Sequence, residues 1–120
     1  MVLAVPIEGK PWHYRKVTVH FNHALTARVF GSDWRVTPNA ENIYCGNAWI
    51  SRKKLAHEIG HTEDALRLGW KYLPTIARDF VKYGHENSPS EIRANTYRDA
   101  HWQEWPHMGQ VPEWAKGEDF

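Results

Sequence analysis

Apolar and polar residues alternate in short runs through the first half of the chain. Val17, Val19 and Phe21 alternate with polar residues, and this period of two is typical of a strand with one buried face. The segments 34–36 and 42–45 are β-prone and bounded by turn-forming residues, which predicts two further short strands. This half of the chain therefore predicts a small twisted sheet of three to four short strands.

The segment 24–30 allows two interpretations. It is either a short helix capped by Asn22 and closed by Gly31, or a bent strand over 27–30. The pattern leaves both open.

The pattern changes to helical spacing at Ser51. Apolar residues recur from Leu55 to Leu66 at intervals of three and four, Ser51 is placed to cap the start, and Gly69 is placed to end the helix. This is the longest element that the sequence predicts.

Two more helices and a tail complete the chain. Pro74 in a first turn and Gly84 beyond the last predict a helix over 75–83, and a third helix is expected from 89 to about 102. Residues from about 103 to 120 are a tryptophan-rich tail with several prolines and glycines. We expect one α+β domain over 1–120, with the sheet packed on the first long helix and further helices after it.

Composition excludes several classes of protein. The chain has 120 residues and a formal net charge of +1, so one domain is expected and bulk charge gives no reason for a nucleic-acid partner. The basic run 52–54 is interpreted as a solvated helix face. We expect no membrane partner, because no apolar run approaches the roughly 18 residues that a membrane-spanning helix needs.

The only cysteine and the first residues suggest a compartment. Cys45 is alone and is interpreted as a small buried hydrophobe, so no disulfide within the chain is possible. The apolar start of the chain lacks a basic flank and is soon interrupted by Pro6, which argues against a signal peptide. We expect a cytoplasmic protein.

The sequence His57-Glu58-Ile59-Gly60-His61 has the HExxH pattern and lies inside the long helix. Residues four apart share one helix face at about 5–6 Å between Cβ atoms, so His57 and His61 can bind the same ion, expected to be one Zn²⁺. Glu58 is rotated by about 100° from His57, which places its carboxylate beside that ion as a general base for a water molecule. This spacing predicts hydrolysis of peptide bonds.

An ordinary structural role is the alternative. Both histidines can be hydrogen-bonded on a partly buried face, with Glu58 paired to a nearby cation. Gly60 favours the metal site, since glycine inside a helix costs about 1 kcal/mol and is easier to understand where another element approaches closely.

A catalytic zinc usually has three protein ligands, and three residues compete for the third position. Asp64 shares the face of the histidines but lies about 10.5 Å along the helix from His57, which is too far. His85, after Gly84, is the second choice.

Glu91 is the preferred third ligand, because a second helix packed on the first can present a carboxylate to the ion. The alternative is a capping box, in which Ser88 caps the helix and Glu91 reaches back to its backbone N–H. Asn95, one turn later, is placed to accept a hydrogen bond from a ligand imidazole, with Asp99 as the alternative for that task.

With these residues the chain resembles the gluzincin branch of zincin metallopeptidases, in which HExxH is followed by a glutamate ligand on a later helix. The segments 27–30, 41–46, 55–61 and 89–94 are similar to the small zincin-like domain associated with contractile injection systems. The resemblance implies zinc, peptidase activity and a strand just before the active helix, over 43–50, as one edge of a cleft. The chain departs from the pattern over 62–70, which lacks a glutamine-rich continuation, and at Asn95, which replaces an acidic residue.

Three functions therefore compete. The first is a zinc-dependent peptidase, most simply an endopeptidase, that binds an extended peptide or protein substrate along an exposed strand edge. The second is a catalytically silent zinc-containing binding or structural module, and the third is a metal-free, tryptophan-rich interaction protein. Cleavage specificity and oligomeric state stay open, as does the donor to the oxyanion, for which the candidates are Tyr83, His85, Tyr97 and His101.

Overall fold

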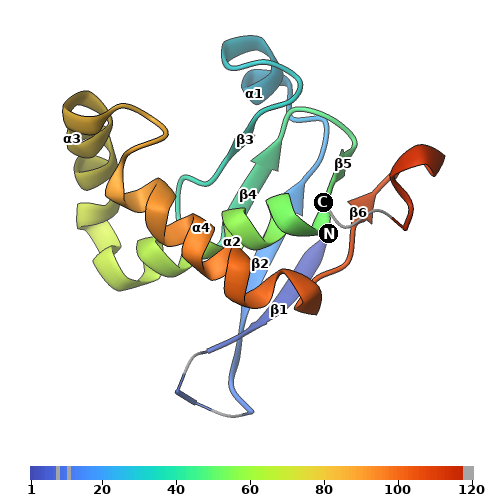
Figure 1. Cartoon of the computed structure of the whole chain (residues 1–120), viewed down its shortest axis with the longest axis horizontal. Coiled ribbons are helices and arrows are strands. Elements are labelled where there is room, and N and C mark those ends of the chain that lie inside the picture. The colour runs from blue at the N-terminus through green and yellow to red at the C-terminus, as the bar shows by residue number, and fades with distance from the viewer. Residues whose placement is uncertain (8, 11, 118–120) are drawn as a thin grey trace.

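The computed structural model describes residues 1–7, 9–10 and 12–117, and it has the predicted α+β class (Figure 1). The last three residues of the predicted tail lie outside the described residues. The strands are β1 (Val2–Pro6), β2 (Tyr14–His20), β3 (Arg35–Val36), β4 (Asn42–Cys45), β5 (Trp49–Ile50) and β6 (Met108–Gly109). The helices are α1 (Ala24–Val29), α2 (Arg52–Leu68), α3 (Tyr72–Tyr83) and α4 (Pro89–His101), with short 3-10 turns η1 (Gly69–Lys71), η2 (Trp102–Glu104) and η3 (Glu113–Ala115).

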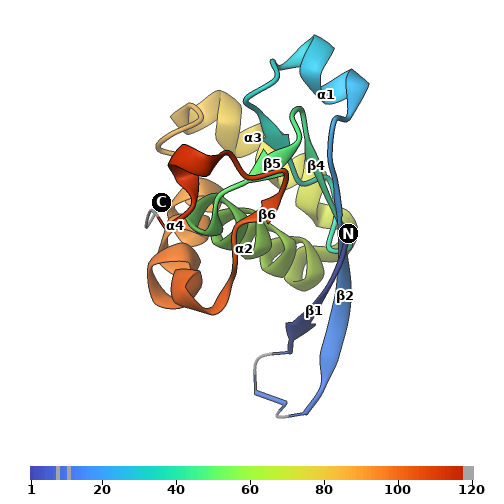
Figure 2. The ribbon, with the colours of Figure 1, turned by 90° about the vertical axis from the view of Figure 1, so that its right-hand side faces the viewer.

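Four strands form the main sheet in the order β1-β2-β4-β3. β1 and β2 are an antiparallel hairpin, β2 and β4 are parallel, and β3 is antiparallel to β4. The β1–β2 hairpin extends away from the helices in both ribbon views (Figures 1 and 2). β1 was not predicted, because its five residues have no clear alternation and are recognisable only by their pairing with β2.

The single cleft-edge strand expected over 43–50 is wrong in one respect. The segment divides into β4 and β5, because the chain leaves the sheet after Cys45. The turn begins at Gly46, where a Cβ would lie only 2.7 Å from the carbonyl oxygen of Gly31. β4 is paired on both sides, and β5 pairs with β6 in a separate two-stranded sheet. The edge of the main sheet at this side is β3.

The segment 24–30 is a helix, α1, but Asn22 does not cap it. Asn22 has a positive φ of 54° and turns the chain, and His23 accepts a hydrogen bond from the backbone N–H of Thr26 at the helix start. The helix ends at Val29, with Phe30 as its C-cap just before Gly31.

The caps of the long helices are as predicted. The Ser51 side chain accepts from the N–H of Lys54 at the start of α2, and Gly69 ends that helix. Ser88 caps α4 in the same way. α3 begins at Tyr72, earlier than expected, with Pro74 in its first turn, where the missing N–H costs no helical hydrogen bond.

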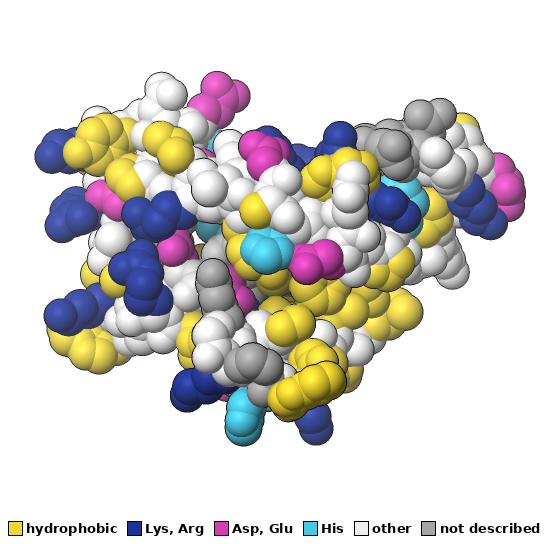
Figure 3. Space-filling view, turned by 60° about the horizontal axis from the view of Figure 1, so that its bottom comes forward, with side chains coloured by type: hydrophobic (Ala, Val, Ile, Leu, Met, Phe, Trp, Pro, Cys, Tyr) yellow, Lys and Arg dark blue, Asp and Glu magenta, His cyan; other side chains and the backbone are white. Residues whose placement is uncertain are grey.

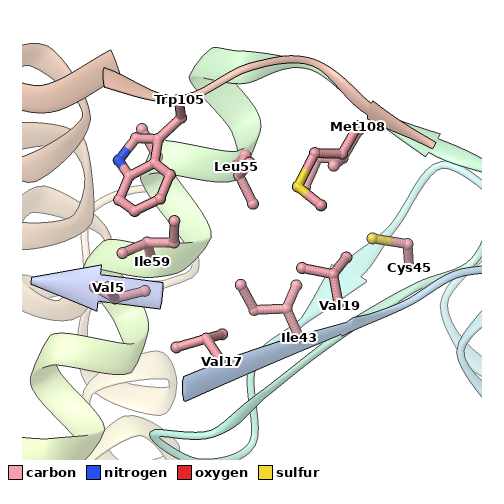
Figure 4. Packing of buried hydrophobic residues seen from close by; sticks show 11 residues of the cluster. Val5, Val17, Val19, Ile43, Cys45, Leu55, Ile59, Trp105 and Met108 are labelled. Atoms are coloured by element: carbon pink, nitrogen blue, oxygen red, sulfur yellow. The ribbon is translucent and has the colours of Figure 1, made fainter. Parts of the chain in front are cut away.

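The core lies between the main sheet and α2 (Figure 4). Its fully buried side chains include Val17 and Val19 from β2, Ile43 from β4, and Leu55 and Ile59 from α2. Cys45 belongs to this cluster, which confirms its interpretation as a small buried hydrophobe.

The tail completes the core. Trp105 and Met108 are buried against the sheet and α2, and β6 pairs with β5 beside the start of α2 (Figures 2 and 4). His107 accepts a hydrogen bond from the backbone N–H of Arg52 at 3.0 Å. The tail therefore anchors the first turn of α2.

Within the described residues, no helix combines the length and apolarity required to cross a membrane. Lys and Arg side chains gather on the left of the space-filling view, the side on which α3 lies in Figure 1 (Figure 3). The net charge is nevertheless close to zero, so this is a local feature.

Candidate metal centre

His57 and His61 lie one turn apart on α2 with their rings turned toward each other. Their Nε2 atoms are 3.2 Å apart, and the ring planes are inclined by 85°. Both side chains are largely buried, with 14% and 10% of their surface exposed. The spacing that the sequence predicted therefore brings both Nε2 atoms to one point.

Glu91 supplies a carboxylate to the same point from α4. Its Oε2 lies 2.8 Å from His57 Nε2, and its Oε1 lies 3.1 Å from His61 Nε2. The backbone N–H of Glu91 donates to Ser88 Oγ at 3.3 Å, so one half of the predicted capping box forms while the carboxylate faces the two imidazoles.

Gly60 allows α4 to come this close. A Cβ at Gly60 would lie 3.0 Å from Ala94 Cα and 3.0 Å from Tyr97 Cβ, which is tighter than ordinary packing. The close approach expected from a glycine inside a helix is thus the contact with α4, the helix that carries Glu91.

Each histidine is oriented by a polar partner on α4. His57 Nδ1 is 2.8 Å from Asn95 Oδ1, and His61 Nδ1 is 3.2 Å from Ser90 Oγ. When Nδ1–H donates in both contacts, both Nε2 lone pairs face the shared point, which is the tautomer that a metal ligand requires. Asp99, the alternative for this task, pairs with Arg98 instead.

Glu58 is buried beside the histidines and is held by Thr37. Thr37 Oγ1 donates to Glu58 Oε2 at 2.8 Å, and the Tyr72 hydroxyl donates to the carbonyl oxygen of Thr37 at 2.8 Å. One ligand atom from each of His57, Glu58 and His61 lies within 4.8 Å of the others. Glu58 thus points at the same region with one oxygen fixed.

The other two candidates for the third ligand lie differently. Asp64 is buried under Arg93, whose Nε donates to both carboxylate oxygens at 2.9 Å. His85 Nε2 is 3.2 Å from Glu91 Oε1, and the side chain is 49% exposed. His85 therefore contacts the preferred ligand from the solvent side.

The pKa shifts follow from this convergence. Burial raises the pKa of Glu91, but hydrogen bonds from His57 and His61 outweigh it and hold the Glu91 pKa well below its usual range. Burial opposes charging of His61, yet the hydrogen bond with Glu91 and the carboxylates of Glu58, Glu91 and Asp64 raise its pKa. The contact between Glu91 and His61 therefore favours the charged form of each side chain despite its burial.

This donor set fits a zinc ion. Two imidazole nitrogens and a carboxylate are a common set of three protein ligands for catalytic zinc, and four ligands at about 2.0–2.1 Å in a tetrahedron lie about 3.3 Å apart. The three observed separations run from 2.8 to 3.2 Å. The Glu91 carboxylate would also balance part of the charge of a divalent ion, so charge and geometry agree.

The centre opens into a cleft of about 940 Å³. One side is formed by β3 and the residues after it, another by α3, and the floor by α2 and α4. Among the described residues, the outer edge of β3 pairs with no other strand.

Of the four candidate oxyanion donors, His85 lines the cleft, whereas Tyr83, Tyr97 and His101 are not among its lining residues.

Sequence reasoning missed Thr37 and Ser90. Both are hydroxyl residues that contact the centre across elements, 21 and 29 positions away from their partners. No spacing rule connects such positions.

Comparison with known proteins gives no relative: no protein-family model, no curated protein and no solved structure matches the chain.

Proposed function

We propose that this chain is a zinc-dependent peptidase in which His57, His61 and Glu91 hold one Zn²⁺ and Glu58 is the general base. The observation that carries the proposal is the meeting of two Nε2 atoms and one carboxylate within 2.8–3.2 Å of one another. The gluzincin resemblance of the sequence points to the same chemistry. A purely structural histidine pair would not need a buried, separately held glutamate beside it.

Zinc bound by these ligands would polarise a substrate carbonyl and lower the pKa of a water molecule to about 7. Glu58 accepts a proton from the attacking water and passes it to the departing amine, so that one peptide bond and one water become a carboxylate and an amine. Thr37 fixes one oxygen of Glu58, which leaves the other free to face the water. Asn95 and Ser90 keep the imidazoles oriented through Nδ1.

The open edge of β3 supports a peptide substrate. An extended segment that pairs with Arg35 and Val36 by main-chain hydrogen bonds would lie along one side of the cleft. His85 is the side chain best placed to donate to a developing oxyanion from the solvent side.

Glu58→Gln tests the mechanism. The variant should fold and bind one zinc per chain like the wild type, while peptide hydrolysis falls by at least about a hundredfold, because the amide cannot act as a base. Zinc content is measured by mass spectrometry on protein purified without a histidine tag, and hydrolysis on a denatured protein substrate.

Each result separates the competing functions. Unchanged hydrolysis in Glu58→Gln would remove Glu58 from the mechanism. A wild type that binds zinc and cleaves nothing would be a zinc-containing binding module, and a wild type without metal would leave only a metal-free interaction protein.

A further inference from the structure

α3 has an apolar face that the core does not cover. Leu73, Ile76 and Phe80 lie three and four residues apart, which places them on one side of the helix. A helix of this kind usually buries such a face. Here all three residues line the cleft, and Leu73 and Phe80 are 57% and 54% exposed. The apolar side of α3 is therefore a wall of the cleft.

An aromatic contact joins this wall to the candidate metal centre. The ring of His85 lies 5.5 Å from that of Trp34 and 6.3 Å from that of Phe80, measured between centroids. His85 Nε2 in turn is 3.2 Å from Glu91. His85 therefore connects the apolar wall to the carboxylate of the candidate metal centre.

The opposite end of the cleft is basic. Lys53, Lys54 and Arg98 line it, and Asp33 is the one acidic lining residue apart from Glu58 and Glu91 at the centre. Lys54 is exposed and has no ion pair among the residues that the structure describes. The ammonium of Lys53 lies over the ring of Trp102 at 4.6 Å, and an aromatic ring carries no negative charge that would cancel it.

The two ends lie on opposite sides of the centre. Lys54 comes three residues before His57, about 4.5 Å along the axis of α2. α3 follows the other end of α2 after η1 (Figure 1). Arg98 comes seven residues after Glu91, so α4 also runs from the aromatic end to the basic end.

We propose that the cleft takes an extended peptide with a large apolar side chain, aromatic or aliphatic, against α3 and an acidic side chain toward Lys54 and Arg98, on opposite sides of the scissile bond. This inference rests on the proposed function and adds the substrate class. Burial of the apolar side chain covers surface on α3 that otherwise contacts water. The acidic side chain meets the ammonium of Lys54, unpaired among the described residues, and the guanidinium of Arg98, whose Nε also pairs with Asp99 at 3.0 Å. The free edge of β3 holds the backbone between the two side chains.

Matched fluorescence-quenched peptides test this directly. They carry phenylalanine or serine on one side of a fixed central bond and glutamate or lysine on the other, in both orders. With the zinc-loaded protein, kcat/KM should be higher for phenylalanine than for serine by on the order of tenfold or more. Glutamate should exceed lysine a few-fold, and only this second preference should shrink in high salt.

Variants at the two ends of the cleft test which residues cause each preference. Phe80→Ala should reduce the phenylalanine-to-serine ratio severalfold, whereas Val81→Ala, at an adjacent residue that is 86% exposed and does not line the cleft, should leave it unchanged. Lys54→Glu should reverse the charge preference. Lys71→Glu, which makes the same charge change outside the cleft, should not.

Binding to the Glu58→Gln protein separates failure of this inference from failure of the proposed function. Cleavage without either preference, or preferences unchanged in Phe80→Ala and Lys54→Glu, would overturn the inference and leave the peptidase. Selective binding of the phenylalanine–glutamate peptide without any cleavage by the wild type would support the cleft chemistry and overturn the peptidase.

Discussion

Glu91 lies at the start of α4, where its backbone and its side chain have separate tasks. Ser88 Oγ accepts the Glu91 N–H, so the helix start does not need the carboxylate. The carboxylate instead contacts His57, His61 and His85. One residue thus begins the helix and completes the candidate ligand set.

Thr37 is expected to position the general base. Thr37→Val removes the hydrogen bond to Glu58 and keeps the side-chain shape, and loss of a hydrogen bond to a charged group costs about 1.5–3 kcal/mol. We predict that kcat falls by about tenfold or more, with KM and zinc content close to the wild type. Steady-state kinetics on one peptide substrate measure both constants.

Thr37→Ser is the matched control, because it restores the hydroxyl. Recovery of most of the lost kcat in Thr37→Ser would support the positioning role. Equal losses in the two variants, or no loss in Thr37→Val, would contradict it.

At the residue scale, local geometry decides what the sequence can predict. His57, Glu58 and His61 were predictable because positions three and four apart on one helix have fixed relations. The expected acceptance of a hydrogen bond by Asn95 from a ligand imidazole is matched by its contact with His57 Nδ1, since Asn95 lies one helical turn after Glu91. Thr37 was not predictable, since its contact with Glu58 depends on how β3 packs beside α2.

At the element scale, the contact between α2 and α4 sets the distance from Glu91 to the histidines. Gly60 on α2 packs against Ala94 on α4, and the two backbones come close because Gly60 has no Cβ. Small shifts of α4 move Glu91 and Asn95 together, so the centre depends on this one close approach.

Gly60→Ala should therefore weaken zinc binding. Alanine gains up to about 1 kcal/mol of helix propensity, but overpacking against a backbone neighbour costs about 1–3 kcal/mol. We predict a net loss of unfolding free energy and at least a severalfold higher Kd for zinc. Urea unfolding without metal and competition with a zinc chelator measure the two effects.

Leu66→Ala provides the comparison on the same helix, because Leu66 is half exposed and does not line the cleft of the metal centre. Its zinc affinity should match the wild type. A Gly60→Ala protein with unchanged zinc affinity would show that α4 does not need this approach.

The predictability of elements follows their local signals. α2 and α4 were predicted close to their true ends because Ser51, Gly69 and Ser88 mark them. β1 and β6 were missed, since each is defined by its pairing partner. β3, the cleft edge, was predicted as a strand, but its place at the edge is a property of the whole sheet.

At the scale of the whole molecule, the sheet, α2 and the tail pack around one core. Trp105 and Met108 pack on the same cluster as Ile43 and Leu55. The tryptophan-rich composition of the tail does not reveal where it packs, because contacts so distant along the chain have no local signature. The described part of the tail covers the core.

Burial of Cys45 in this core predicts a stability change at alkaline pH. Burial raises the pKa of its thiol from 9.0 to about 11. Between these values the folded state keeps a thiol proton that the unfolded chain releases. The contribution of the buried thiol to the free energy of unfolding is therefore complete below pH 9 and is lost as pH rises toward 11. Its size is on the order of 1–3 kcal/mol.

Urea midpoints near pH 8 and pH 10.5 measure this loss. Cys45→Ala should lose less unfolding free energy between pH 8 and pH 10.5 than the wild type, because it has no thiol to ionise. Burial also raises the pKa of Tyr97, to about 12, and this adds a loss of the same sign in both proteins. Identical losses in the two proteins would contradict the Cys45 assignment.

Anomalous diffraction at the zinc absorption edge, from a crystal of the untagged protein, tests the proposed metal centre most directly. We predict a single peak at about 2.0–2.2 Å from His57 Nε2, His61 Nε2 and a Glu91 carboxylate oxygen, with Glu58 beside it and not bound to it. A crystal grown with zinc that shows no peak between the two imidazoles, or a peak bound without Glu91, would contradict it.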